Sequence, residues 1–497
     1  MVESMRAFGY TPETAIADLV DNSVAAGAKN VWVKFWWAGA DSYVSVCDDG
    51  RGMSEQELFE AMRLGTIGPL EERAPADLGR FGLGLKTASF SQCRRLTVST
   101  HNGDGAPSVR RWDLDYVQKT NEWRLLKTAA AGSENLLNMD HGGPTGTVVL
   151  WEQLDRIVGG TGDPSDNRAH DHFLRMIRAV DDHLGMVFHR MLQSPVPRLR
   201  LWIDGGGMAG PRAIQPWDPF LETHPATTCF PEERIPLGTG FVVVKGFVLP
   251  HKSHFGPGEH EAAGGPSGWN ARQGFYVYRN ERLVVPGSWL GIGADRQWTR
   301  EEHYKLARIR VDFPNSMDLD WQLDVKKSDA RPPAELRERL RDLALAVRAT
   351  AREVYAFRGG VGAGTRRTST EPEAPWKAAT IQGHPVYRLK RDYPVVRQVK
   401  AMLRDGDRAT LEGLLRVIEE TVPIHRVWID MSEHPDSHAE PFELDELEEL
   451  QELARMFYNA LTDTLGLAPQ EALDRMARMD PFARRADCDH ILKELTD

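Results

Sequence analysis

The chain has 497 residues, which is too long for one ordinary hydrophobic core and predicts two or three domains. Its 41% hydrophobic and 27% charged residues are typical of a soluble globular protein, and its net charge of −11 argues against a surface that binds nucleic acid everywhere. Four cysteines without a CxxC pair favour free thiols, and the sequence has no signal pattern and no apolar run of about 18 residues, so we expect a cytoplasmic protein that does not enter a membrane.

The first predicted region covers residues 1–155 and mixes helix and strand signals. Residues 11–26 carry a proline at the first turn and apolar residues at helical spacing, and Gly27 ends the pattern. A second helix begins at Ser54 with a capping box, and residues 65–78 form a glycine- and proline-bearing loop. Strand-like segments are expected at 30–37, 42–47, 95–100, 108–113 and 147–151. Together these signals predict an α+β domain.

Three further segments follow along the chain. Residues 165–357 begin with a helical stretch, pass through several strands and end in a long helix. Residues 358–375 are rich in Gly, Ser, Thr and Pro, which is typical of a linker. Residues 376–497 are mainly helical and include an acidic helix at 442–465. We interpret its acidic face as solvated, with a docking surface for a basic partner as the alternative.

Asp18 and Asn22 lie four residues apart on the first helix, so both side chains project from one face. A carboxylate there can orient or deprotonate a water molecule, and an amide oxygen one turn further can ligate Mg²⁺. Taken alone, the pair is more typical of a polar stripe on an amphipathic helix.

The sequence DDGRGMS follows a predicted strand that ends at Cys47. Asp48 can accept a hydrogen bond from an exocyclic amine such as that of adenine, and Gly50 and Gly52 allow the backbone to approach a flat base. The alternative is a simple strand-to-helix turn, where Asp-Gly is common.

In GRFGLGLKTASF, Gly79, Gly82 and Gly84 precede a predicted helix. Unpaired amides at a helix N-terminus bind phosphate oxygens, and Lys86 adds a positive charge in the first turns. The glycines alone could equally serve a tight turn.

The three patterns in this order resemble the GHKL ATPase superfamily, which includes gyrase, the heat-shock chaperone, histidine kinases and MutL. The resemblance implies a Bergerat-type ATP-binding sandwich that binds ATP and Mg²⁺, with Asp18 as the catalytic base and Asn22 as the metal ligand. It implies that Thr147 assists the adenine-binding aspartate. The residues that it assigns to ATP binding are Asn22, Asp48, Gly50, Gly52, Met53, Gly79, Phe81, Gly82, Leu83, Gly84, Leu85, Lys86 and Thr147.

Within the superfamily, DLVDNSVAAGAKNVWV is similar to MutL and MORC proteins, and GRFGLGLKTAS is most similar to MORC. Downstream, GFYVYRNERLV and LDWQLDVKKSDARPP are similar to the transducer-like, ribosomal-S5-like α/β domain of MORC and heat-shock relatives, where a lysine reaches the γ-phosphate. Lys326 and Lys327 are the candidates for this catalytic role, and a solvated basic pair is the alternative. The resemblance covers about residues 10–355, and the remainder is only loosely similar to bacterial MORC-like proteins encoded with restriction or phage-defence systems.

Two positions depart from the family pattern. The base is usually glutamate, and Asp18 withdraws the carboxylate by roughly 1.5 Å. Because a displacement of about 1 Å can cost on the order of a hundredfold in rate, we expect either slow hydrolysis or a backbone shift that compensates for the shorter side chain. Ala25 stands where the family often has an aspartate, so a supporting polar contact is expected to be missing.

The resemblance therefore implies a slow, Mg²⁺-dependent ATPase that forms an ATP-gated homodimer. It further implies DNA as a partner, a role in bacterial defence, and an unknown protein partner for the C-terminal region. The alternatives are a nucleotide-binding scaffold without turnover and a chaperone that acts on protein clients. A histidine kinase is disfavoured, because no sensor segment precedes the motifs and the transducer-like motif follows them.

Overall fold

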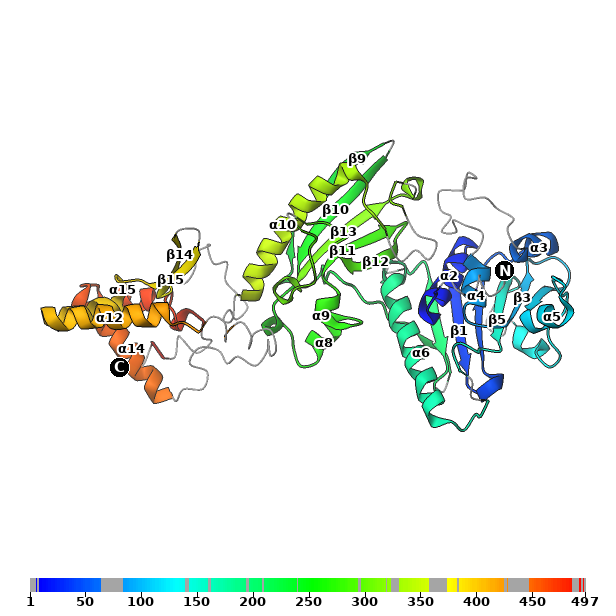
Figure 1. Cartoon of the computed structure of the whole chain (residues 1–497), viewed down its shortest axis with the longest axis horizontal. Coiled ribbons are helices and arrows are strands. Elements are labelled where there is room, and N and C mark those ends of the chain that lie inside the picture. Colours follow the sequence, from blue (N-terminus) through cyan, green and yellow to red (C-terminus); the bar gives the residue numbers. More distant parts are fainter. Residues whose placement is uncertain are drawn as a thin grey trace. The chain divides into compact units, whose positions relative to one another are not determined.

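The computed structural model folds into two compact units, Met1–Tyr355 and Ala356–Asp497 (Figure 1). In the described residues, no helix is long and apolar enough to cross a membrane. The structure describes residues 6, 9–63, 84–138, 143–159, 162–193, 196–207, 210–238, 240–293, 296–318, 320–322, 330–356, 373–381, 384–423, 427, 447–484, 491–492 and 495.

The first unit begins with a mixed sheet that has seven strands among the described residues, in the order β4-β3-β5-β2-β1-β6-β7. All neighbouring strands are antiparallel except β1 and β6, which run parallel. The strands are β1 (Asn30–Trp36), β2 (Tyr43–Asp48), β3 (Arg95–His101), β4 (Ser108–Asp113), β5 (Gly146–Glu152), β6 (Arg200–Asp204) and β7 (Arg212–Ala213).

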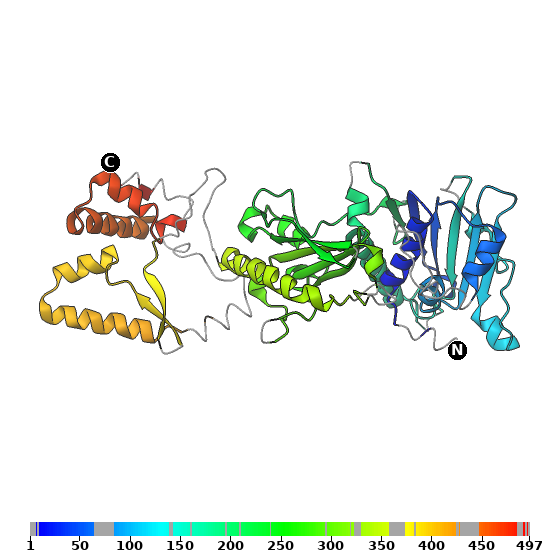
Figure 2. The same cartoon turned by 90° about the horizontal axis from the view of Figure 1, so that it is seen from above.

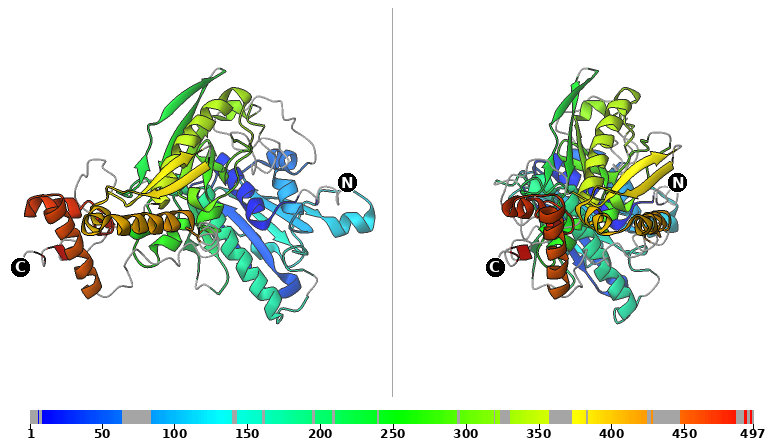
Figure 3. Two further views of the ribbon diagram at one scale, coloured as in Figure 1. Left: turned by 60° about the vertical axis from the view of Figure 1, so that its left-hand side comes forward. Right: turned by 90° about the vertical axis from the view of Figure 1, so that its left-hand side faces the viewer.

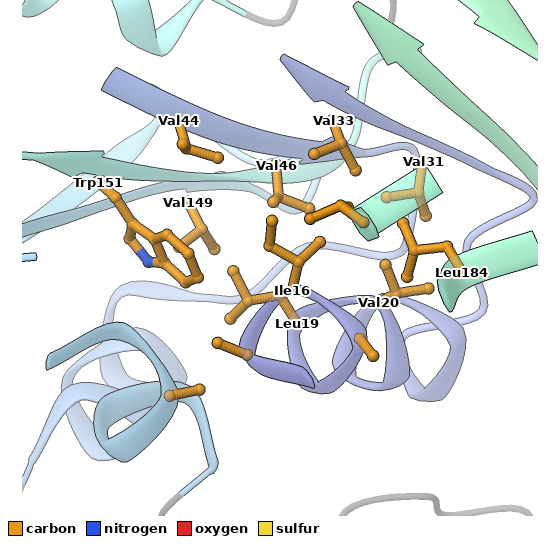
Figure 4. Packing of buried hydrophobic residues seen from close by; sticks show 14 of the residues in the cluster. Ile16, Leu19, Val20, Val31, Val33, Val44, Val46, Val149, Trp151 and Leu184 are labelled. Carbon is orange, nitrogen blue, oxygen red and sulfur yellow. The ribbon is translucent and has the colours of Figure 1, made fainter. Parts of the chain in front are cut away.

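Helix α2 packs one face of this sheet and forms its core. Its residues Ile16, Leu19 and Val20 point at the valines of β1 and β2, with Trp151 of β5 beside them (Figure 4). Leu184 of α6 closes the same core. The helices of this region are α2 (Pro12–Ala25), α3 (Glu55–Met62), α4 (Gly84–Phe90), α5 (Leu114–Thr120), α6 (Asn167–Val187) and α7 (His189–Gln193).

The hydrogen bonding of β6 extends the first sheet beyond the predicted boundary at residue 155. The sequence pattern places α6 and β6 in the second predicted region, 165–357. Asn30 to Lys34 of β1 pair with Arg200 to Asp204 of β6, and α6 packs against α2. A parallel partner reached through a helix leaves no turn signal in the sequence, so the periodicity could not place it.

A second mixed sheet follows in the same unit, in the order β12-β11-β13-β10-β8, with β9 paired to β10. Helix α10 lies along this sheet (Figures 1 and 3), and a Cβ added to Gly246 of β10 would lie 2.5 Å from Val347 of α10. The elements are β8 (Thr228–Cys229), β9 (Glu233–Leu237), β10 (Gly240–Val248), α8 (Glu259–Gly264), α9 (Gly268–Ala271), β11 (Gly274–Arg279), β12 (Arg282–Ser288), β13 (Ala307–Phe313) and α10 (Ala334–Ala356).

The second unit has its own apolar core, in which Tyr393, Phe457 and Phe482 are buried. It is mainly helical with one hairpin (Figure 2), and the predicted α+β class with a helical C-terminal region is confirmed. Its elements are β14 (Trp376–Ile381), β15 (His384–Leu389), α11 (Pro394–Met402), α12 (Asp405–Glu420), α14 (Leu447–Asn459) and α15 (Pro469–Met476). The short helical turns among the described residues of both units are η1 (Gly39–Asp41), η2 (Glu134–Leu137), η3 (Lys252–His254), η4 (Glu302–Tyr304), η5 (Asn315–Met317), η6 (Ala460–Thr464) and η7 (Phe482–Arg484).

Candidate functional site

Asp18 lies on α2 at the point where two of the three sequence motifs meet. Its side chain is buried, with 3% exposure, and the hydroxyl of Tyr10 donates a 2.8 Å hydrogen bond to Oδ2. Gly84, the first residue of α4, lies so close that a Cβ added to it would be 3.6 Å from the same oxygen. The fold therefore brings the DLVDN and GRFGLGLK motifs together, although 66 residues of sequence separate these two positions.

Asn22 lies one turn further along α2 and is exposed, in contrast to its buried neighbours Asp21 and Ser23. Among the described residues, no group of three or more His, Cys, Asp or Glu side chains could hold a metal ion. Mg²⁺ in nucleotide sites is usually held by one or two protein oxygens, with phosphates and waters supplying the rest. An accessible amide oxygen near a carboxylate fits that type of site.

Asp48 ends β2 and is buried, with 5% exposure. The hydroxyl of Ser23 donates to its Oδ2 (2.8 Å), and the amide of Gly50 donates to its Oδ1 (2.9 Å). Burial raises the pKa of this carboxyl above its usual range, while the hydrogen bonds from Ser23 and Gly50 act to lower it. The backbone of Thr147 is a third donor to this carboxylate. A carboxylate has about four lone-pair positions, so Asp48 can still accept a hydrogen bond from a ligand.

A cluster of hydroxyls connects Asp48 to the neighbouring strands. Thr147 of β5 pairs with Asp48 across the sheet, and its hydroxyl lies 2.9 Å from that of Thr100 on β3. The Thr100 hydroxyl accepts a hydrogen bond from the amide of Met53 (2.9 Å) and donates one to the carbonyl of Gly146 (3.1 Å). The two threonines therefore fix the chain that leaves Asp48.

The two glycines of DDGRG have a structural role within the protein. A Cβ on Gly52 would lie 2.0 Å from the carbonyl oxygen of His101, and Gly52 has a φ of +65°. A Cβ on Gly50 would lie 2.9 Å from the Asp48 carboxylate and 3.0 Å from Ala26. Glycine is therefore required so that this turn can pack against α2 and the end of β3.

Lys86 of α4 is fully buried, and its ammonium donates hydrogen bonds to the carbonyls of Ala61 (3.0 Å) and Arg63 at the end of α3. Burial lowers the pKa of Lys86 to about 8. The motif predicts that this charge binds phosphates, whereas in this structure it contacts the main chain at the end of α3. Leu85 beside it packs partly against the first core.

Six of the candidate residues lie outside the described residues. They are Gly79, Phe81, Gly82, Leu83, Lys326 and Lys327. Their roles stay predictions from the sequence.

A family model described as histidine kinase-, DNA gyrase B- and HSP90-like ATPase matches residues 10–143. That stretch contains α2, the turn after β2 and α4, which are the elements that build the site. The chain carries a GHKL ATPase domain.

Known relatives of this ATPase domain are MORC and MutL proteins. The chain is 33% identical to the ATPase morc-1 of Caenorhabditis elegans over 194 residues, which cover 31% of this chain and 22% of that protein. It is 33% identical to the DNA mismatch repair protein MutL of Halobacterium salinarum over 107 residues, 21% of this chain and 16% of that protein. It is 25% identical to MutL of Thermosipho africanus over 118 residues, 23% of this chain and 20% of that protein. The matches thus span about a fifth of each relative or less.

Three polar residues of the ATPase domain belong to the site but could not be predicted from the sequence patterns. They are Tyr10, Ser23 and Thr100. Tyr10 lies just before the helix cap, Ser23 follows Asn22, and Thr100 is inside a strand. Their hydrogen bonds to Asp18, Asp48 and Thr147 depend on the folded geometry. A serine inside a helix commonly bonds the carbonyl four residues back, and the Ser23 hydroxyl does lie 3.3 Å from the carbonyl of Leu19, so its bond to Asp48 had no local signal either.

Ser23→Ala tests the environment of Asp48 in the ATPase domain. Removing the donor raises the Asp48 pKa further, so the folded state binds a proton more readily than the unfolded state. The contribution of Asp48 to the stability of the folded state then falls as the pH rises from the unfolded pKa near 3.8 through the higher folded pKa. We expect the free energy of unfolding to drop by about 1.5–3 kcal/mol at pH 7 and by less at pH 4, measured by denaturant titration.

Ser45→Ala is the control, because Ser45 lies on β2 three residues from Asp48 and on the opposite face of the sheet. Its effect on stability should be small and the same at both pH values. Equal losses at pH 4 and pH 7 for Ser23→Ala would contradict the assigned role of the serine.

Proposed function

We propose that this chain binds ATP with Mg²⁺ and hydrolyses it slowly. The observation that carries the proposal is the meeting of Asp18 with Gly84 at the start of α4, with Asn22 one turn further along α2. A carboxylate, an amide oxygen and a helix N-terminus are the groups needed for water, Mg²⁺ and phosphate.

Each residue has a separate role in this proposal. Asp18 orients and deprotonates the attacking water, while Asn22 supplies an oxygen to Mg²⁺, which neutralises phosphate charge when bound. Asp48 accepts a hydrogen bond from the adenine amine, with Thr147 fixed beside it by Thr100. The glycine-rich segment through Gly84 holds the phosphates, and Lys326 or Lys327 adds a cation from the second region.

Slow turnover follows from the shortness of Asp18 and from its partner. The Tyr10 hydroxyl donates a hydrogen bond to Oδ2 and so occupies one of the positions at which the carboxylate could hold the attacking water. The same contact favours the second candidate function, a nucleotide-binding scaffold without turnover. The two functions differ only in whether phosphate is released.

Lengthening the Asp18 side chain is the direct test of catalysis. We expect Asp18→Glu, combined with Tyr10→Phe to free the longer carboxylate, to raise kcat by about tenfold to a hundredfold. Asp18→Asn should abolish phosphate release and leave the affinity for a non-hydrolysable ATP analogue nearly unchanged. Phosphate release by the purified chain with and without Mg²⁺ is the measurement.

Asn22→Ala and Tyr10→Phe alone are the matched controls. The first should remove the Mg²⁺ dependence of binding, and the second should change kcat by less than the double variant. If no variant releases phosphate but the analogue binds, the scaffold function replaces hydrolysis. If Asn22→Ala and Asp48→Asn both leave the affinity unchanged, the site assignment is refuted.

The pH dependence of binding tests the role of Lys86. Burial lowers its pKa to about 8, and a phosphate nearby would favour the charged form and raise that pKa. The affinity for the analogue should therefore fall as the pH rises through 8, by up to about tenfold between pH 7 and pH 9. Titration calorimetry measures this.

Lys86→Arg should bind with an affinity that is flat over the same range, because a guanidinium stays protonated. Lys86→Met should bind weakly at every pH. A wild-type affinity that does not change between pH 7 and pH 9 relative to Lys86→Arg would exclude Lys86 from phosphate binding.

The proposal includes ATP-dependent homodimerisation and engagement of DNA, in a bacterial defence role, with the C-terminal unit contacting a further protein. The DNA part rests on the likeness to MutL, whose name ties it to DNA mismatch repair.

We expect light scattering to detect a dimer with the analogue and a monomer without it. Retention of duplex DNA should increase with the analogue and decrease with salt, and no retention of any DNA form would remove DNA from the proposal.

A further inference from the structure

The hairpin between β11 and β12 carries two arginines at its tip. Arg279 and Arg282 are paired across the strands, and the two-residue turn between them is Asn280-Glu281. Both turn residues have positive φ, +48° and +68°. Such a turn fixes the direction of the hairpin tightly, and it is adopted here without glycine.

Arg282 reaches from this hairpin into the ATPase domain. Its Nε donates to both carboxylate oxygens of Asp21 on α2, at 3.0 and 2.9 Å, and its Nη1 donates to the carbonyl of Leu283. The side chains of Arg282 and Asp21 are 4% and 0% exposed. This ion pair joins residues 261 positions apart in the sequence and is fully removed from water.

Two arginines, Arg282 and Arg272, act on His183 of α6 beside this pair. Burial together with the charges of these arginines lowers the pKa of His183 to about 3, so the histidine is neutral at physiological pH and adds no positive charge beside Asp21. The ring of Phe188 lies 5.8 Å from the guanidinium carbon. In such surroundings the loss of either partner leaves an uncompensated buried charge.

The other arginine of the hairpin, Arg279, holds its tip to the turn η5, whose last residue is followed by Asp318. Arg279 donates through Nε and Nη2 to the two oxygens of Asp318, at 2.7 and 2.8 Å, and both side chains are largely buried. Glu281 of the turn is ion-paired with Arg198, which lies just before β6. The Glu281–Arg198 pair is exposed to solvent and adds little, so the tip of the hairpin is held mainly by the buried Arg279–Asp318 pair. Arg282 therefore has little freedom to follow Asp21 if α2 moves.

We infer that Arg282 is a positioning residue for the ATP site and acts through Asp21. Asp21 lies on α2 between Asp18 and Asn22, the two residues that the proposed function places at water and Mg²⁺. Successive residues on a helix are rotated by about 100° around its axis, in a fixed relation to one another. Holding the Asp21 side chain therefore also fixes the direction in which Asp18 and Asn22 project from α2. The inference rests on the proposed function, and it makes the second sheet part of the catalytic arrangement.

Replacing both charges of the Asp21–Arg282 pair distinguishes a role in positioning α2 from a role in stability alone. Asp21→Asn and Arg282→Met alone should each lower the unfolding temperature strongly. The double variant, Asp21→Asn with Arg282→Met, should recover most of that loss, because it leaves no buried charge. Its kcat should still fall by about tenfold to a hundredfold, because α2 has lost its anchor.

Nucleotide binding gives a second readout that a merely structural role would not move. In the double variant, the affinity for an ATP analogue without Mg²⁺ should stay within about threefold of the wild type, because Asp48 is on β2. The gain in affinity on adding Mg²⁺ should shrink by about tenfold, because Asn22 is displaced. Arg282→Lys should restore part of this gain, since a lysine keeps the charge but not the planar fork.

A matched control uses the ion pair between Arg6 and Asp155, in which Arg6 is also buried. Arg6→Met with Asp155→Asn should leave kcat and the Mg²⁺ gain as in the wild type. If the Asp21–Arg282 double variant behaves like this control, the positioning role is overturned. If the wild type releases no phosphate, the hydrolysis in the proposed function fails, and the Mg²⁺ gain alone then decides for or against Arg282.

Discussion

The packing of α2 determines the geometry of the whole site, because three of its polar side chains are buried and each has its own partner. Asp18 is bonded to Tyr10, Asp21 to Arg282, and Ser23 to the Asp48 carboxylate. The apolar side of the helix packs on the valines of the sheet. A buried polar group that loses its partner costs about 1–3 kcal/mol, and more if it is charged. Any rotation of α2 would strain these contacts together, so the helix has one stable orientation.

That orientation explains why Asn22 is exposed among buried neighbours. With Asp21 and Ser23 directed to Arg282 and Asp48, the residue between them has to face outwards. Its availability for a metal is therefore a consequence of the bonds on either side. The partners of Asp48 also determine its state. Burial raises the pKa of this carboxyl, and the hydrogen bonds from Ser23 and Gly50 oppose that rise by stabilising the charged form.

The sequence was sufficient for those parts of the fold that depend on local pattern. It predicted the α+β class and, to within a few residues, the bounds of α2, β1, β2, β3 and β5. The three motifs could also be recognised from the sequence, because each consists of a few adjacent residues. It could not pair β6 with β1, since a parallel connection through α6 has no characteristic turn. Nor could it find the Asp21–Arg282 pair, because charged residues far apart in sequence carry no sign of their partner.

Lys86 shows the limit of motif reasoning for a single side chain. The motif places a lysine two residues after Gly84, but the direction of its ammonium depends on α3, which provides the carbonyls of Ala61 and Arg63. The glycines of DDGRG show the same limit. A glycine can be needed because an adenine base packs against the backbone or because a neighbouring strand does, and the sequence does not distinguish the two. At Gly52 the structure shows a neighbouring strand, because the carbonyl of His101 occupies the position that a Cβ would take.

The second sheet is attached to the ATPase domain by directional polar contacts at more than one point. Besides Arg282, Arg190 of α7 is ion-paired with Asp312 of β13, and His189 lies 2.7 Å from the Tyr278 hydroxyl of β11. Burial lowers the pKa of His189 to about 4, so this contact joins two neutral groups at physiological pH. Polar contacts of this kind are lost over small displacements, whereas apolar surfaces can slide. A change at the nucleotide site that moves α2 must therefore either carry the second sheet with it or break the Asp21–Arg282 pair, and the buried charges make breaking the costlier outcome.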